Sequence, residues 1–228
     1  TTGPLGQGFA NAVGMAIASK MSAAHFNTSD HKIVSHRVFA IAGDGDLMEG
    51  ISTEAASMAG HFRLDNLLVI YDDNKITIDG ETSLTFSEDI EKKFQALGWR
   101  VLRMDGHGHG QITDTLEQAV SGADRPTLLI AESHIAFGSP GKQDTSGSHG
   151  APLGEDEIKA TKKNIGWNYP DDFHVPQEVY DFFKSLGDGL QQAYDEWKNT
   201  FEQWKTANPE LADMRERMMS KQTPENLE

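Results

Sequence analysis

The stretch Val38-Phe39-Ala40-Ile41-Ala42-Gly43-Asp44-Gly45 decides the fold, because a β-branched and aromatic run ends there in a carboxylate between two glycines. A second hydrophobic run, Leu67-Leu68-Val69-Ile70, leads into Asp72-Asp73-Asn74-Lys75-Ile76. Glycines beside a strand end let backbone N–H groups approach an anion closely. A glycine-flanked Asp also occurs in ordinary turns, so the prediction depends on its pairing with Asn74. Carboxylate and amide oxygens at adjacent strand ends suit Mg²⁺ near a diphosphate, and the two motifs therefore predict half of a metal-diphosphate site.

The composition restricts the partners of the chain. Its 228 residues include 35 acidic and 20 basic side chains, a formal charge of -15, which argues against binding nucleic acid or an anionic membrane surface. There is no cysteine, so disulfides and thiolate metal sites are excluded. The sequence shows no apolar run long enough for a membrane span and no signal peptide, and we expect a cytoplasmic protein. Because Thr1-Thr2-Gly3 already resembles part of a site, we expect that the chain continues upstream.

Hydrophobic periodicity predicts an α/β fold with a mainly parallel sheet sandwiched by helices. A helix is expected after the loop Gly3-Pro4-Leu5-Gly6-Gln7-Gly8, with Ala10, Val13, Ile17 and Met21 on one face. Strands and helices then alternate, as is typical of βαβ units. Thr85 and Glu88 are expected to form a capping box for the third of the helices in this order. The expected strands are 37–42, 67–72, 99–104 and 127–133, and the expected helices are about 47–62, about 88–98 and 111–121.

Beyond the last strand the composition changes twice. Residues 136–152 form a long loop rich in Gly, Ser, Pro, Thr and Asp, at the sheet edge where ligands bind in parallel folds. After Pro176 the chain is helical and acidic, and residues 205–228 read as a linker or chain end. We therefore predict a cofactor-binding domain at 1–170, truncated at its start, and a helical linker at 171–228. Five residues recur at helical spacing and are expected to form an apolar stripe that packs against another part of the protein: Leu190, Tyr194, Trp197, Phe201 and Trp204.

Four motifs together resemble transketolase, a thiamin diphosphate-dependent family. The loop Thr1-Thr2-Gly3-Pro4-Leu5-Gly6-Gln7-Gly8 and the segment Ser148-His149-Gly150-Ala151-Pro152-Leu153 are similar to that enzyme in particular. The Asp44 and Asn74 motifs are similar to the wider thiamin diphosphate class. The resemblance covers nearly the whole chain and implies the diphosphate-binding domain with the start of the linker toward an absent pyrimidine-binding domain.

The resemblance assigns ligand roles to individual residues. It implies that Asp44 and Asn74 bind Mg²⁺ or Ca²⁺ through their side chains and Ile76 through its backbone carbonyl. Gly45 would donate its N–H to the diphosphate, which agrees with a glycine at a strand-to-helix turn. The residues implied around the rings of the cofactor are Gly3, Pro4, Leu5, Ile78 and Ile135, although ordinary core packing explains the two isoleucines equally well.

Histidine and glutamate roles also follow from the resemblance. His149 would touch the diphosphate and the substrate end of the cofactor and assist proton transfer, which suits a group that titrates near neutral pH. Glu49 and Glu54 are five residues apart, and their spacing alone indicates two solvent-exposed acidic side chains on a helix. The resemblance instead implies that both lie at a dimer interface. His107 and His109 resemble a metal pair, but we interpret their segment as a loop after a strand.

The implied reaction is the reversible transfer of a two-carbon ketol unit from a ketose phosphate to an aldose phosphate. The glutamate that activates the cofactor in this family lies on a pyrimidine-binding domain, which the 228 residues do not include. We therefore expect a partner domain or chain, in a homodimer or a split-subunit heteromer. Two alternatives stay open: a related thiamin enzyme such as dihydroxyacetone synthase, or a cofactor-binding subunit that is inactive without a partner chain.

Overall fold

A computed structural model describes residues 2–221 and residue 223, and these divide into two compact units. One unit contains the residues up to Ala18 together with Arg37–Asn168. The other contains Ser19–His36 together with the chain from Tyr169 onward. Helix α1 (Gln7–Phe26) contributes residues to both. The second unit thus includes residues 19–36, which nothing in the sequence pattern separated from the cofactor-binding domain.

A four-stranded parallel sheet forms the centre of the first unit. Its strands are β1 (Val38–Gly43), β2 (Leu67–Asp73), β3 (Arg100–Asp105) and β4 (Thr127–Glu132), in the order β1-β2-β4-β3. The register places Gly43 opposite Asp72, and Asp73 opposite Glu132. The carboxyl ends of β1, β2 and β4 therefore meet at one edge, and the expectation of an α/β fold with a parallel sheet is confirmed.

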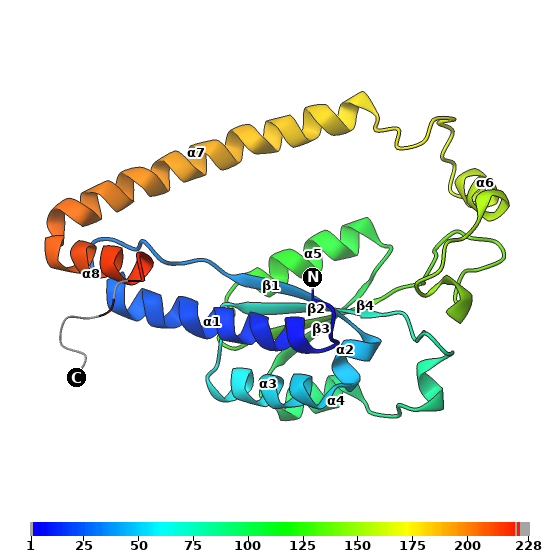
Figure 1. Ribbon diagram of the computed structural model, residues 1–228, viewed down its shortest axis with the longest axis horizontal. Helices are drawn as coiled ribbons and strands as arrows, with labels where there is room; N and C mark the ends of the chain where they lie inside the picture. The colour runs from blue at the N-terminus through cyan, green and yellow to red at the C-terminus, as the bar shows by residue number, and fades with distance from the viewer. Residues whose placement is uncertain (1, 222, 224–228) are drawn as a thin grey trace. The chain divides into compact units, whose positions relative to one another are not determined.

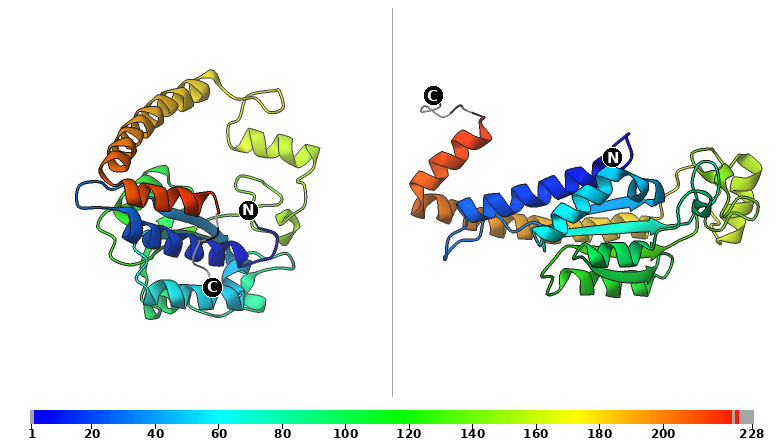
Figure 2. Two further views of the ribbon diagram at one scale, coloured as in Figure 1. Left: turned by 60° about the vertical axis from the view of Figure 1, so that its left-hand side comes forward. Right: turned by 90° about the horizontal axis from the view of Figure 1, so that it is seen from below.

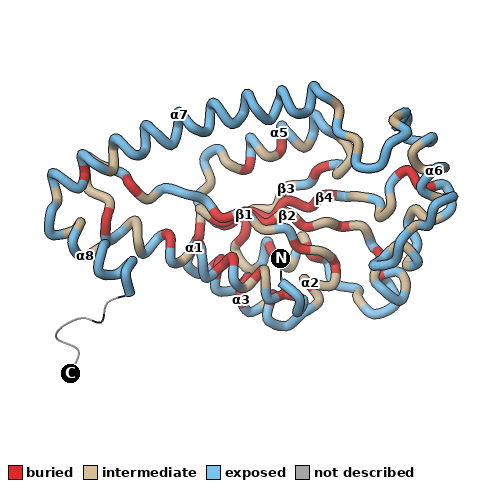
Figure 3. Tube along the Cα trace, turned by 45° about the horizontal axis from the view of Figure 1, so that its top comes forward, coloured by how far each residue is buried: buried red, intermediate tan, exposed pale blue. Residues whose placement is uncertain are grey.

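Helices cover both faces of this sheet, as Figures 1 and 2 show. On one face, α1, α3 (Gly50–His61) and α4 (Ile90–Ala96) pack on the larger hydrophobic core. On the other face, α5 (His109–Val120) covers a smaller core around Leu129. The buried residues follow the strands in Figure 3. In the larger core, the Trp99 indole N–H donates to the carbonyl oxygen of Ala56 at 2.8 Å, which satisfies a buried donor.

The local helix predictions need three corrections. The helix expected at 47–62 is two helices, α2 (Asp44–Met48) and α3, because Glu49 between them has an extended backbone with ψ 139°. Helix α4 begins after Asp89, whose carboxylate accepts the Lys92 N–H at 3.0 Å, so the Thr85 and Glu88 capping box was wrong. In α1, Val13 is buried as expected, but Met21 is 59% exposed.

The second unit has its own small core. Helices α7 (Gln177–Ala207) and α8 (Pro209–Met219) pack with residues 26–34 around the fully buried Trp204. The stretch 205–228, expected as a linker or chain end, contains helix α8, which starts with a proline, a favoured residue at that position. Residues 222 and 224–228 of that stretch lie outside the described residues. Part of the predicted stripe packs, since Trp197, Phe201 and Trp204 stack in sequence, whereas Leu190 and Tyr194 are exposed.

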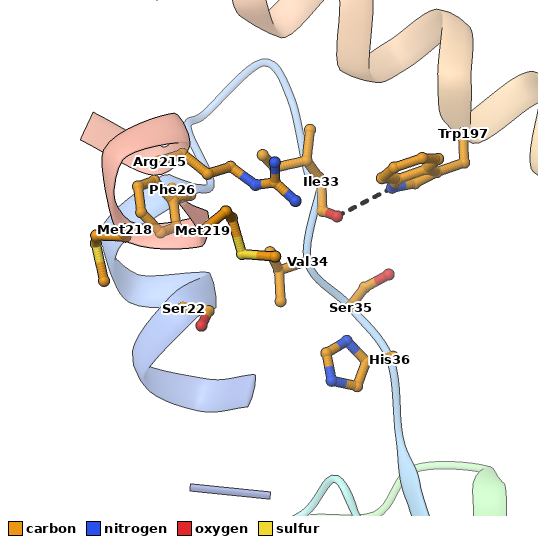
Figure 4. Close-up of a pocket in the computed structure, with 10 residues that line it drawn as sticks. All are labelled: Ser22, Phe26, Ile33, Val34, Ser35, His36, Trp197, Arg215, Met218 and Met219. Atoms are coloured by element: carbon orange, nitrogen blue, oxygen red, sulfur yellow. Dashed lines mark hydrogen bonds between the residues drawn. The ribbon is translucent and has the colours of Figure 1, made fainter. Parts of the chain in front are cut away.

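Trp197 also lines a hollow of about 580 Å³ within this unit, drawn in Figure 4. Its indole N–H donates to the Ile33 carbonyl oxygen at 3.0 Å. Arg215 of α8 lies over the ring of Phe201, 4.9 Å from its centroid, and two methionines of the same helix complete the wall. The remaining elements of the described chain are η1 (Thr82–Leu84), η2 (Ser146–Ser148) and α6 (Glu155–Asn164). No helix among the described residues is both long and apolar enough to span a membrane.

Candidate metal and diphosphate site

A cavity of about 740 Å³ opens at the carboxyl edge of the sheet, within the first unit. Its walls come from segments that are far apart in sequence but meet where β1, β2 and β4 end. They include most of the residues that the sequence singled out: Leu5, Asp44, Gly45, Glu49, Asn74, Ile76, Ile78, Ile135 and His149. The size falls in the range of cofactor pockets, and the location is where ligands bind in parallel α/β folds.

Asp44 is the first residue of α2 and is only 5% exposed. Its Oδ1 accepts the Tyr71 hydroxyl at 2.5 Å, and its Oδ2 accepts the Lys75 backbone N–H at 3.1 Å. Burial raises the pKa of this carboxyl, and the nearby Asp73 raises it further, against the lowering effect of the Tyr71 hydrogen bond. A cation beside Asp44 would favour the charged form of its carboxylate, so this side chain is suited to bind a metal ion.

The Tyr71 hydroxyl lies within hydrogen-bonding distance of two carboxylates, those of Asp44 and Asp73. It lies 2.9 Å from Asp73 Oδ1 as well as 2.5 Å from Asp44 Oδ1. Asp73 is buried, and its carboxylate pairs with the Lys75 ammonium at 2.6 Å. Burial and the hydrogen bond to Asp44 raise the pKa of Tyr71 far above its usual value, so the phenol keeps its proton. Nothing in the sequence pattern singles out Tyr71 or gives Asp73 a role.

The turn after β2 presents Asn74 and Ile76. Asn74 donates from Nδ2 to Asp72 Oδ2 at 3.2 Å, and its Oδ1 accepts the Ile76 N–H at 3.0 Å. Between them, Lys75 adopts a left-handed backbone with φ 65°, which is uncommon for a residue with a Cβ and concentrates at functional sites. This turn directs the Lys75 N–H at Asp44, so the conformation of one candidate ligand segment helps to hold the other.

Asp46 fixes the loop that precedes α1. Its Oδ1 accepts the Gly6 N–H at 2.8 Å and its Oδ2 accepts the Gly43 N–H at 2.9 Å. Gly6 has φ +74°, and a Cβ there would lie 2.8 Å from side-chain atoms of Ile51 and Ser52, so only glycine fits. The adjacent Leu5 consequently lies against Gly45, where a Cβ would meet the Leu5 side chain at 3.2 Å. Asp46 is a structural determinant that the sequence analysis did not identify.

The loop after β4 forms another wall. Ile135 and His149 both line the cavity, and the Asp144 N–H donates to the Ile135 carbonyl oxygen at 3.1 Å. The Asp144 carboxylate also lies 2.9 Å from His134 Nδ1. A hydrogen bond from Ser139 lowers the pKa of Glu157 on α6, and the same carboxylate accepts the Gly141 N–H at 2.7 Å. These contacts hold both ends of the loop close to the sheet edge.

Three of the predicted site residues lie elsewhere. Gly3 and Pro4 are exposed and are not among the residues that line the cavity, although their neighbour Leu5 is. Glu54 is exposed on α3, whereas the exposed Glu49 lies at the cavity wall. Ile78 is 70% exposed there, so core packing does not explain it.

The interpretation of His107 and His109 as a loop agrees with the contacts of His107. Its Nε2 accepts the His134 N–H at 2.9 Å, and its ring stacks on Phe137 with a centroid distance of 4.0 Å. His109 begins α5. Nowhere in the described part of the chain do three or more His, Cys, Asp or Glu side chains converge on a possible metal position. A metal at this edge therefore depends on mixed oxygen ligands such as Asp44 with Asn74.

The charges of the cavity test whether a metal and a diphosphate would fit. Among the described residues that line it, none is Lys or Arg, and five are carboxylates: Asp44, Asp46, Glu49, Asp72 and Asp79. An anion alone would be repelled, so a diphosphate fits only with a cation that offsets these charges. Apolar side chains occupy other parts of the wall, where they could pack against the rings of an organic ligand: Leu5, Met48, Ile78, Leu84 and Ile135.

Comparisons with known proteins identify the family of the chain. The family described as "Transketolase, thiamine diphosphate binding domain" matches residues 1–224. A transketolase of Geobacillus stearothermophilus is 45% identical over 100% of the chain and 34% of its own length. A solved transketolase of Leishmania mexicana has a TM-score of 0.94 at 37% identity, over 99% of this chain and 34% of that one. A Pichia stipitis transketolase in complex with sedoheptulose 7-phosphate has a TM-score of 0.93 at 39% identity, with the same coverage of 99% and 34%.

The parallel sheet and its carboxyl-edge cavity thus define a thiamin diphosphate-binding domain. The chain belongs to the transketolase family. It spans about a third of the length of the curated relatives that it matches. These comparisons do not favour the dihydroxyacetone synthase alternative, since the cited relatives are named transketolase.

Proposed function

We propose that this chain provides the metal-diphosphate half of a transketolase active site. The enzyme would reversibly transfer a two-carbon ketol unit from a ketose phosphate to an aldose phosphate, in the pentose phosphate pathway of the cytoplasm. The observation that carries the proposal is the meeting of Asp44, Gly45, Asn74 and His149 in one cavity at the sheet edge. Family membership supports the same conclusion.

The metal would be Mg²⁺ or Ca²⁺, held by the side-chain oxygens of Asp44 and Asn74 and by the Ile76 carbonyl oxygen. Both ions prefer oxygen ligands, and Mg²⁺ usually adds phosphate and water oxygens to a few protein ligands. Gly45, at the start of α2, would donate its N–H to the diphosphate. The carboxylate-rich wall supports this assignment, because the cation is needed to offset its charge.

The rest of the cavity would hold the organic part of the cofactor. Gly3, Pro4 and Leu5 would lie near its rings, and Ile78 and Ile135 would give apolar support. Thiamin diphosphate, when bound, supplies the nucleophilic carbon and the electron sink that ketol transfer requires. The described residues contribute by binding the cofactor, orienting it and excluding water.

His149 would be the catalytic residue of this chain. It lines the cavity at the end of η2 and would contact the diphosphate and the sugar, where an imidazole can move a proton. The sugars would be phosphates like the sedoheptulose 7-phosphate of the Pichia stipitis complex.

Two further parts would complete the enzyme. A pyrimidine-binding domain or chain would supply the activating glutamate, with residues 171–228 as the helical linker toward it. In a homodimer or split-subunit heteromer, Glu49 and Glu54 would join a glutamate cluster at the interface. Their exposure leaves both side chains available for such a contact.

A reconstitution assay tests the proposal. The chain is mixed with a separately produced pyrimidine-binding chain, thiamin diphosphate and Mg²⁺, and ketol transfer from sedoheptulose 7-phosphate to an aldose phosphate is followed. We expect activity in the mixture and none with either chain alone, and Asp44→Ala should abolish it. Cofactor binding without turnover in the mixture would instead favour a cofactor-binding subunit. Equal activity of Asp44→Ala and the parent would contradict the metal assignment.

A further inference from the structure

We propose that Tyr71 is a positioning residue for the metal, because its buried hydroxyl fixes the orientation in which the Asp44 carboxylate would bind a divalent cation. The inference rests on the proposed function, since it takes Asp44 as a metal ligand. It assigns a role to a residue that is not among the described residues lining the cavity and would not itself contact the cofactor or the sugar.

The position of Tyr71 makes its hydroxyl rigid. The residue lies in the middle of the first unit's sheet, on β2, and is 3% exposed. Neighbouring strands flank it through the register pairs with Ala42 and Ile130. Its ring belongs to the larger hydrophobic core, where close packing leaves a side chain little freedom, so its oxygen offers a fixed hydrogen-bonding point to Asp44.

Asp44 is held at both of its oxygens. Oδ1 accepts from the Tyr71 hydroxyl at 2.5 Å and Oδ2 accepts from the Lys75 N–H at 3.1 Å. Two donors at two oxygens define the plane of the carboxylate, while each oxygen keeps a lone pair for a cation. Removal of the Tyr71 hydroxyl would leave one of the two constraints, and the carboxylate could then rotate about its Cβ–Cγ bond.

The charges explain why a tyrosine is suited to this position. Asp73, the second partner of the Tyr71 hydroxyl, is paired with the Lys75 ammonium at 2.6 Å. In the described part of the chain no ion pair reaches Asp44. A neutral hydroxyl orients Asp44 without neutralising it, whereas a Lys or Arg at this point would compete with the metal for the same charge. Partners of this kind change metal affinity by about 10- to 100-fold when they are removed.

The experiment measures Mn²⁺ binding to the 228-residue chain in the presence of inorganic pyrophosphate. Calorimetry gives the affinity, and electron paramagnetic resonance gives the spectrum of the bound ion, which reports the symmetry of its ligands. Tyr71→Phe removes one oxygen and keeps the ring. The matched control is Tyr194→Phe, the same change at an exposed position on α7 in the other unit. Asp44→Ala tests the site itself, and circular dichroism defines a temperature at which every variant is folded.

For Tyr71→Phe we expect affinity for Mn²⁺ about 10- to 100-fold weaker than in the parent and a changed spectrum of the bound ion. Tyr194→Phe should match the parent in both. If Asp44→Ala loses Mn²⁺ while Tyr71→Phe binds like the parent, the role of Tyr71 is overturned and the metal site stands. Weaker binding with an unchanged spectrum would also overturn it, because the ligands around the ion would then keep their orientation without the Tyr71 hydroxyl. Parent-like binding by Asp44→Ala, or no binding by the parent, would overturn the proposed metal site as well.

Discussion

Asp46 and Gly6 are joined by a hydrogen bond of 2.8 Å between the carboxylate of the first and the backbone N–H of the second, across 40 residues of sequence. The other oxygen of the same carboxylate accepts the N–H of Gly43 at the end of β1. One side chain thereby attaches the loop before α1 to the sheet edge. Leu5 reaches the cavity because of this attachment, so a residue outside the ligand set determines part of the cavity wall.

Asp46→Asn should therefore weaken both the fold and the site. An amide has a single acceptor oxygen, so one of the two N–H groups would face an amide NH₂ and lose its partner. The unmet donor costs about 1–3 kcal/mol of unfolding free energy, measurable by urea denaturation. Affinity for thiamin diphosphate in the assembled enzyme should also fall. Asp114→Asn, on the exposed surface of α5, is the control and should leave both quantities unchanged.

Asp44→Asn should make the metal-free chain more stable while weakening its binding of metal. The pKa of Asp44 is raised, mainly by burial, so its neutral form favours folding, and that stabilisation is lost as the pH rises through the raised pKa. An asparagine side chain can donate to the Tyr71 oxygen and accept from the Lys75 N–H, which frees the single Tyr71 proton for Asp73. Without metal, we expect the Asp44→Asn chain to melt at a higher temperature than the parent at pH 7, as measured by calorimetry.

Below the usual carboxyl value of 3.8 this difference in melting temperature should disappear, because Asp44 is then protonated in both the folded and unfolded parent. The affinity of Asp44→Asn for Mn²⁺ should be more than about 100-fold weaker than that of the parent. This loss exceeds the one expected for a residue such as Tyr71, which contacts a metal ligand but not the metal. A variant that melts lower than the parent at neutral pH would show that the buried charge does not oppose folding.

His149→Ala should reduce turnover more than cofactor binding. The imidazole lines the cavity but makes no part of the proposed metal set, so the Kd for thiamin diphosphate with Mg²⁺ should change only a few-fold. Loss of a proton-transferring group lowers kcat by about 10²- to 10⁴-fold. Steady-state kinetics and calorimetry on the assembled enzyme measure the two effects. Equal losses in Kd and kcat would mean that His149 only binds the cofactor.

Asp144→Ala should loosen the loop that carries Ile135 and His149. The Asp144 carboxylate is hydrogen-bonded to the His134 ring, and the Asp144 backbone N–H donates to the Ile135 carbonyl oxygen at the start of the loop. The side-chain pair is exposed, so its loss should lower global stability by less than about 1 kcal/mol, and the left-handed backbone of residue 144, φ 57°, adds about 1 kcal/mol because Ala tolerates it less well than Asp. Hydrogen exchange should nevertheless become faster over residues 135–149. Unchanged exchange there would show that the backbone contacts alone hold the loop.

The sequence was sufficient for the sheet and for the convergence of Asp44 and Asn74. Runs such as Leu67-Leu68-Val69-Ile70 suit buried strands between helices, and parallel strands bring their carboxyl ends to one edge. Ile76 came from resemblance alone, since every residue has a carbonyl oxygen. The roles of Gly3, Pro4, Glu49 and Glu54 stay predictions, because they concern a bound cofactor or a second subunit.

Other features depend on contacts that no local pattern encodes. In the sequence, Tyr71 is an ordinary strand residue. Only the fold brings its hydroxyl to 2.5 Å from the carboxylate of Asp44, which is 27 residues away. Asp46 reads as part of an acidic helix start, although it binds the loop before α1. The segment Pro209–Met219 resembles a chain end in sequence because many of its residues are charged. Only a few of its apolar residues pack near Trp204, and the sequence pattern does not reveal which ones do.

The excess of carboxylates in the cavity wall has one more consequence. A diphosphate without a cation meets five carboxylates and no Lys or Arg among the described lining residues, and a cation without a diphosphate lacks the phosphate oxygens of its shell. Each should therefore increase the affinity for the other by the same factor, as linkage requires. The cavity would then respond to the two species jointly, so that free phosphates in the surroundings compete poorly for it.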